Sequence, residues 1–308
     1  MNRRLAAIAA VSLSIAAACG IFIVVATATD WIDGDYRSWA VPLRTCTATP
    51  WAKKTGAGEH RSVDLEWAGS DAVRIKIPAQ VHFQPGPKPQ ASVSGDADLV
   101  SHVRLRDGTL EWDTPEWDAL IDCRPPGDLV VRLAGPAVTS WTLDGSGELD
   151  LSDLKQDALR IAMHGSGAVT ASGEAHVASL DSSGSGRADL GRLLTEKINA
   201  NIHGSGDLKL SDTKQNELRI VTHGSGAITA SGTAQQVSLE ATGSGRADLG
   251  RLVVDSATAR VHGSGDVDLA PRQDADISVS GSAVVKLHGA VARVSSHVSG
   301  SGQIQREP

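Results

Sequence analysis

Apolar and polar residues alternate through the second half of the chain, and a Gly-Ser-Gly tripeptide interrupts this alternation at regular intervals. The fourth and sixth residues after the first glycine are apolar and their neighbours are mostly polar, as in the segment DLKL at 207–210. Residues before a tripeptide alternate too, as Ile198, Ala200 and Ile202 show. A period of two is typical of a β-strand with one buried face. Each repeat therefore predicts two short strands joined by a glycine corner.

The glycine corners recur with a nearly constant period. Successive corners begin 18 to 20 residues apart, and copies 59 residues apart match best, since GSGRADLGRL occurs at 184–193 and again at 243–252. Glycine is expected at these corners because it tolerates positive φ and the close approach of another backbone. The corners begin at nine glycines, the one at 281 reading Gly-Ser-Ala: Gly145, Gly165, Gly184, Gly204, Gly224, Gly243, Gly263, Gly281 and Gly300.

A fixed period near 20 residues with strand-like alternation predicts a β-solenoid, in which strands of successive turns pair and their inward residues form one core. One turn buries too few aliphatic side chains to offset the entropy of ordering its backbone, so the turns must stabilise one another by stacking. We expect an all-β, right-handed β-helix with about 19–20 residues per turn, because strand twist and crossover chirality favour that hand.

The chain is predicted to begin with a signal peptide or N-terminal transmembrane anchor at residues 1–29. Arg3 and Arg4 precede a 25-residue uncharged run, which contains an Ala-Thr-Ala cleavage motif at 26–28 and is long enough to span a bilayer. Both alternatives place the rest of the chain outside the cytoplasm. The other predicted parts are a connector, an irregular β region that caps the solenoid, and the solenoid itself: residues 30–60, 61–141 and 142–308.

Aromatic residues are confined to the first 141 residues, which hold all seven tryptophans. We expect Trp112, Trp117 and Trp141 to pack inside the cap. A platform for sugar rings is the alternative.

Cys46 and Cys123 are the only cysteines outside the N-terminal segment. In an oxidising compartment they are expected to form a disulfide, and two buried free thiols are the alternative.

Charge and motifs argue against several functions. The net charge is −7 and the pI about 5.8, so the chain lacks the basic surface of a nucleic-acid-binding protein. Gly-Ser-Gly lacks the Lys-Ser/Thr of a phosphate-binding loop, and its period differs from that of calcium-binding glycine-rich nonapeptides. No Ser-His-Asp arrangement can be distinguished from the serines and histidines of the repeat itself. We therefore expect no catalytic residues, no cofactor and no metal.

Histidines occur repeatedly at the position just before the corner glycine. They are His164, His203, His223 and His262. His203 and His223 belong to adjacent turns, so their backbones should lie about 4.8 Å apart. The four are candidate binding residues on an outward ladder. Metal binding is the more specific alternative, but no third ligand accompanies the adjacent pair His203 and His223. A polar ladder bonded to neighbouring hydroxyls is the simpler interpretation.

These features resemble a known family, the "putative auto-transporter adhesin, head GIN domain". The resemblance rests on an exported chain, a β-rich opening like 73–86, a strand like 129–133, and repeated Gly-Ser-Gly turns, and it covers about Arg61 to Ile304. It implies a β-helical domain on an envelope protein, and it brings no catalytic residues. The N-terminal anchor and the 59-residue duplication belong to this sequence rather than to the family pattern.

The sequence thus predicts an exported, non-enzymatic, adhesin-like β-solenoid of the bacterial envelope, in the periplasm or on the cell surface. Its expected partner is an envelope or cell-surface polymer or protein, with membrane contact only through residues 5–29. Two alternatives remain, namely a structural or regulatory periplasmic component and a carbohydrate-active enzyme built on a β-helix.

Overall fold

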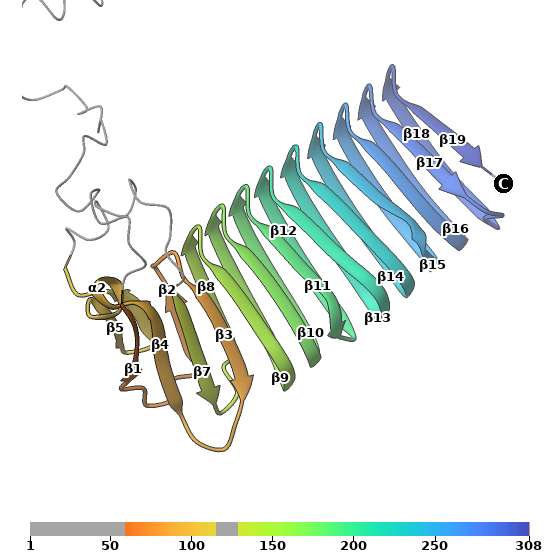
Figure 1. Cartoon of the computed structure of the whole chain (residues 1–308). Coiled ribbons are helices and arrows are strands. Elements are labelled where there is room, and N and C mark those ends of the chain that lie inside the picture. Colours follow the sequence, from red (N-terminus) through yellow and green to blue (C-terminus); the bar gives the residue numbers. More distant parts are fainter. Residues whose placement is uncertain (1–58, 115–128, 308) are drawn as a thin grey trace, which may run out of the picture. The chain divides into compact units, whose positions relative to one another are not determined.

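The computed structural model describes residues 59–114 and 129–307. The chain divides into two compact units, residues 1–53 and 54–308, and all described residues lie in the second. This part is built from β-strands, apart from the single short helix α2 (Ala97–Val100) within the described ranges. The strands of the C-terminal half are stacked as the turns of a solenoid (Figure 1), which confirms the predicted fold class.

Each turn of the solenoid pairs in parallel with the next. Gly184 is in register with Gly165 on one side and Gly204 on the other, and Gly204 with Gly224, so that corner stacks upon corner. The corners follow one another along the upper edge in Figure 1. The strands are β9 (Glu148–Gly165), β10 (Ala168–Gly184), β11 (Arg187–Leu194), β12 (Lys197–Gly204), β13 (Asp207–Gly224), β14 (Ala227–Gly243), β15 (Arg246–Gly263), β16 (Asp266–Gly281), β17 (Val284–His288), β18 (Arg293–Gly300) and β19 (Gln303–Glu307).

The inward positions form one continuous apolar core. In the turn that begins at Gly204, Leu208, Leu210 and Ile220 are each at most 1% exposed. The equivalent residues of the other turns, from Leu149 to Val285, are buried as well. The outward residues between them remain partly or fully exposed. The alternation in the sequence therefore separates core from surface as predicted.

The second bend of each turn does not separate two short strands, as the repeat had predicted. Strands β9, β10 and β13 to β16 run through it without a break, and the pairing register shifts there, for example between Ala171 and Gly173. Asp153 and Gly173 have positive φ at this bend, 54° and 109°. Hydrogen bonds to the neighbouring turns continue on both sides of the bend, so the strand is kinked rather than ended.

The N-terminal section, described over residues 59–114 and 129–145, continues the strand pairing of the solenoid. β3 and β8 pair in parallel with the two halves of β9, and β7 pairs in parallel with β3. The outermost pairs are antiparallel: β4 with β7, β1 with β4, and β5 with β6. These strands are β1 (His60–Leu65), β2 (Ala72–Ile75), β3 (Gln80–Pro85), β4 (Gln90–Asp96), β5 (Val103–Arg106), β6 (Thr109–Trp112), β7 (Val130–Gly135) and β8 (Ser140–Gly145).

Aromatic side chains fill the core where this section meets the first turn. Trp141 is fully buried, its ring centroid lies 5.0 Å from that of Phe83, and its indole N–H donates to the Val138 carbonyl oxygen at 3.2 Å. Trp112 is only 6% exposed. Both tryptophans therefore pack the core and offer no platform to a sugar.

Several predictions lie outside the described residues. They concern the N-terminal segment 1–29, the connector up to residue 58, Trp117, and the disulfide between Cys46 and Cys123. Within the ranges 59–114 and 129–307, no helix has the length and apolar character needed to cross a bilayer.

Candidate functional site

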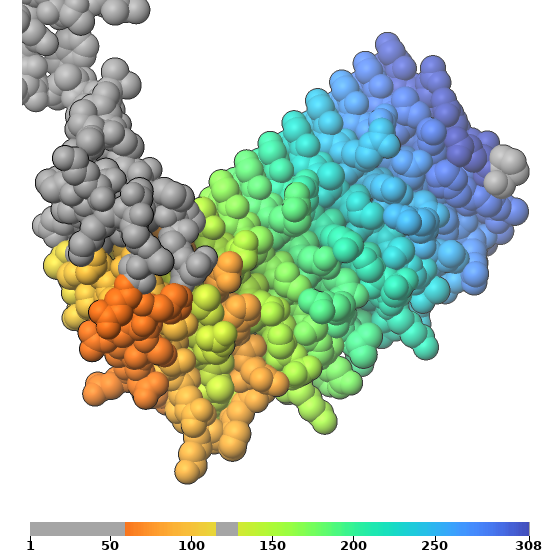
Figure 2. All heavy atoms as spheres, viewed as in Figure 1, coloured from red at the N-terminus to blue at the C-terminus, as the bar shows by residue number. Residues whose placement is uncertain are grey.

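Exposed serines form a straight row along the corner edge. Each is the middle residue of a corner: Ser146, Ser166, Ser185, Ser205, Ser225, Ser244, Ser264, Ser282 and Ser301. From Ser166 onward, their backbone N–H groups bond to the preceding turn, as Ser205 does to the Gly184 carbonyl oxygen at 2.8 Å. Their hydroxyls have no hydrogen-bond partner in the described part of the chain. Adjacent serines are one strand spacing apart, about 4.8 Å. In Figure 2 this upper edge appears as a row of regularly spaced projections.

The predicted histidine ladder lies directly beside the serines. His203 and His223 are in register on adjacent turns, and their rings are stacked, with centroids 5.0 Å apart and an interplanar angle of 11°. His262 instead lies between Thr242 and Ser280 of the neighbouring turns. Only two of the four histidines are therefore neighbours. We call the corner serines and the residues that precede the corner glycines the corner ridge.

The ladder begins with an ion-paired group. His164 Nδ1 is 2.9 Å from one carboxylate oxygen of Asp144, and Arg74 donates to the other at 2.6 Å. Burial alone raises the pKa of Asp144, but the hydrogen bonds from Arg74 and His164 outweigh it and bring the pKa below the ordinary 3.8. Elsewhere in the ladder, Ser183 donates to the Met163 carbonyl oxygen at 3.5 Å. Within the described ranges no three His, Cys, Asp or Glu side chains are grouped to hold a metal ion.

The paired carboxylates predict a loss of stability in acid. Burial likewise raises the pKa of Asp189, but the hydrogen bonds from the Gly191 N–H and from Lys209 have the larger effect and bring the pKa below 3.8. Because the folded-state pKa of both groups is depressed, their stabilisation is complete above pH 3.8 and is lost as the pH falls through the folded-state value. We expect the melting temperature to drop as the pH is lowered through about 4. Thermal melts of Asp144→Asn should show a smaller acid-induced drop than the parent, and equal drops would contradict this role.

The face opposite the histidines, formed by the strands that follow the corners, carries ion pairs between successive turns. Arg187 lies 3.5 Å from Asp207, and Arg246 lies 2.8 Å from Asp266, so the 59-residue duplication repeats the same pair. All four side chains are more than 40% exposed. Exposed pairs of this kind contribute little to stability. This face therefore carries several contacts within the chain, whereas His203, His223 and His262 of the corner ridge form no hydrogen bond or ion pair in the described chain.

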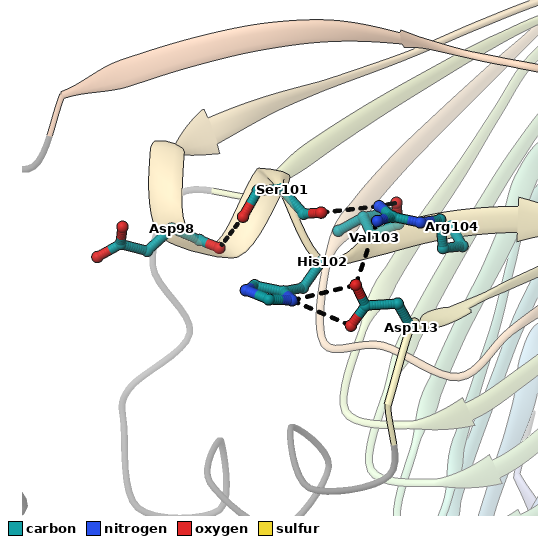
Figure 3. Close-up of polar contacts among 6 residues, drawn as sticks. All are labelled: Asp98, Ser101, His102, Val103, Arg104 and Asp113. Carbon is teal, nitrogen blue, oxygen red and sulfur yellow. Dashed lines mark hydrogen bonds and ion pairs between the residues drawn. The ribbon is translucent and has the colours of Figure 1, made fainter.

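A polar cluster near α2 also has a structural explanation. His102 Nδ1 contacts both carboxylate oxygens of Asp113, at 3.0 and 3.1 Å, and Arg104 donates to the same carboxylate at 3.2 Å (Figure 3). Arg104 also donates to the carbonyl oxygens of Ser101 and Val103. The Ser101 hydroxyl donates to the backbone of helix α2, so it does not complete a Ser-His-Asp triad. The cluster ties the end of α2 to the β5–β6 hairpin.

The sequence matches the model of a family described as "Putative auto-transporter adhesin, head GIN domain" over residues 71–190, 128–216 and 191–291. These matches cover most of the solenoid and of the N-terminal section. The chain belongs to this family. The resemblance drawn from the Gly-Ser-Gly turns is thus confirmed.

Solved structures share the fold of this head GIN domain. A putative lipid binding protein from Parabacteroides distasonis is 20% identical, with a TM-score of 0.61 over 82% of this chain and 98% of its own. A putative adhesin from Parabacteroides merdae is 15% identical with a TM-score of 0.58, and another from P. distasonis is 16% identical with 0.56, each with the same coverage. At these identities the likeness concerns the fold alone. No curated protein matches the sequence.

The sequence predicts the histidine ladder but not the serine row as a surface. The regular serine after each corner glycine is the signal for this row, and by itself it indicates only a turn.

Proposed function

We propose that this protein is an exported, non-enzymatic binding protein that holds a repeating polymer of the bacterial envelope along its corner ridge. The observation that carries the proposal is the row of nine exposed serine hydroxyls without partners in the described chain, one on each turn. The family's description as an adhesin agrees with a binding role. The charged N-terminus followed by an apolar run supports export.

The chemistry of the ridge suits a hydroxyl-rich polymer. Serine hydroxyls both donate and accept hydrogen bonds, and a neutral imidazole offers one donor and one acceptor. The side chains of His203, His223 and His262 form no hydrogen bond or ion pair in the described chain, so these groups are available to a ligand. The spacing of about 4.8 Å is similar to the length of one sugar unit in an extended polysaccharide. Many weak contacts in register could then add to a firm attachment.

The ridge is poorly equipped for hydrolysis. Glycoside hydrolysis generally needs two carboxyl groups that flank the scissile bond. Asp144 is the single carboxylate of the ridge, and both of its oxygens are engaged, by Arg74 and His164. This arrangement favours binding over catalysis.

Substitution of the ridge tests the proposal. The quadruple variant His203→Ala, Ser205→Ala, His223→Ala and Ser225→Ala removes hydrogen-bonding groups from two adjacent turns without touching the core. We expect it to bind polysaccharide extracted from the envelope of the source bacterium at least about tenfold more weakly than the parent, because contacts on a repeating surface act together. Sedimentation of the protein with the insoluble polymer measures this.

A matched control removes hydroxyls from the opposite face. Thr170 and Thr229 face outward there and form no side-chain hydrogen bond in the described chain. The variant Thr170→Ala, Thr229→Ala should bind like the parent. Equal binding by the ridge variant and the parent, or release of shortened polymer by the parent, would overturn the proposal.

A further inference from the structure

A hollow of about 780 Å³ lies on the outer face of the N-terminal section, over strands β1, β4, β7, β3 and β9. These five strands are consecutive neighbours in one sheet, and Figure 1 shows the strands of the N-terminal section next to β9, the first strand of the solenoid. The volume is within the range of pockets that bind small molecules. The hollow is on the sheet and is separate from the corner ridge.

One row of polar side chains crosses the floor of the hollow. The strand registers align Asp64 with Ser92, Ser92 with Arg132, Arg132 with His82, and His82 with Asp150. The residues on either side of this row, such as Val131 and Leu133, are buried, so the row faces outward. Gln84 and Gln90 add two amides to the lining.

Arg132 is the central residue of the row and its one permanently positive side chain. Its side chain is exposed and has no ion pair or hydrogen bond in the described part of the chain. Some other arginines of this protein are paired, as Arg74 is with Asp144 at 2.6 Å. The nearest carboxylates of the row, Asp64 and Asp150, are each two strand spacings away, about 10 Å along the sheet. Asp150 is also engaged by His82, at 3.4 Å.

The two carboxylates limit what the guanidinium can attract. A phosphate with two negative charges would be repelled by Asp64 and Asp150 on either side, whereas a single carboxylate can form a bidentate pair with Arg132 at the centre. The Ser92 hydroxyl and the Gln90 amide form no side-chain hydrogen bond in the described chain and match the hydroxyls of a sugar ring. His82 and Gln84 lie beside them and already contact Asp150 and Asp153, at 3.4 and 3.1 Å. Asp64 and Asp150 are four strand spacings apart, about 19 Å along the sheet, too far for the paired carboxylates of a glycosidase.

We propose that this hollow is a binding site for an acidic sugar, with Arg132 pairing with the sugar carboxylate and the flanking polar groups bonding its hydroxyls. The site does not depend on the corner ridge, so either proposal can fail alone. If both hold, the protein contacts an acidic polysaccharide at two places, with the hollow selecting for charge.

Calorimetric titration of the full chain tests the site. We expect glucuronate to bind and glucose to bind at least about tenfold more weakly, because a charge-assisted bidentate pair contributes more than tenfold in affinity. Arg132→Gln should lose at least about tenfold in glucuronate affinity. Arg132→Lys keeps the charge but not the planar guanidinium that forms a bidentate pair, so its affinity should lie between those of the parent and Arg132→Gln.

The matched control is Arg160→Gln. Arg160 is another exposed arginine without a side-chain partner in the described chain, and it lies on strand β9 outside the hollow. The Arg160→Gln variant should bind glucuronate like the parent. An unchanged melting temperature shows that each variant is folded. Equal affinity for glucose and glucuronate, full binding by Arg132→Gln, or equal competition by inorganic phosphate would each overturn the proposal.

Discussion

Replacing Gly224 by alanine is expected to destabilise the protein by several kcal/mol. Gly224 has a φ of 143°, a conformation that residues with a side chain rarely adopt, and such strain costs about 1–3 kcal/mol. A Cβ atom there would also collide with the Gly204 carbonyl oxygen of the preceding turn. That oxygen also accepts the hydrogen bond from the Ser225 N–H. The two turns therefore cannot move apart to make room for the Cβ atom without breaking this bond. Chemical denaturation followed by circular dichroism measures the change.

Gly145→Ala separates the two contributions. Gly145 also has positive φ, 102°, but a Cβ atom there would meet nothing within 4 Å. This variant should lose only the strain, about 1–3 kcal/mol, and should be clearly more stable than Gly224→Ala. Equal loss in the two variants would contradict the view that stacked corners require glycine for close backbone approach.

The second large effect is expected from Trp141→Ala. Trp141 is fully buried on β8 and packs against Phe83 of β3, where the N-terminal section meets the solenoid. Removing a buried aromatic side chain leaves a cavity and typically costs about 3–5 kcal/mol. Denaturant unfolding should show this loss.

Thr142→Ala is the control on the same strand. Thr142 follows Trp141 directly but faces outward and is half-buried, with no side-chain hydrogen bond in the described chain. Its replacement should change the free energy of unfolding by no more than about 0.5 kcal/mol. A similar loss in both variants would contradict the inward and outward assignment of β8.

The repeat made the solenoid predictable, because each turn repeats the same local information. Inward residues such as Leu208 and Leu210 follow from a period of two, and the positive φ of the corner glycines follows from their regular spacing. The continuous strands through the second bend were not predicted. Asp153 and Gly173 have positive φ at this bend, but hydrogen bonds from the adjacent turns hold the backbone extended on either side.

The N-terminal section was less predictable, because its pairing depends on contacts between distant residues. An irregular β region was predicted over residues 61–141, yet no local signal places β7 parallel to β3 and antiparallel to β4. The hollow was missed for the same reason. Arg132 alternates outward like any strand residue, and only the register with His82 and Ser92 shows that it lies at the centre of a polar row.

The most direct test of the central claim, an exported binding protein, is the accessibility of a C-terminal tag to added protease in the source bacterium. Export predicts that the tag is cut while the cytoplasmic membrane is still intact, either on whole cells or after the outer layers are permeabilised. Cutting on whole cells would place the solenoid on the surface. A tag that is protected until the cytoplasmic membrane is lysed would contradict the account.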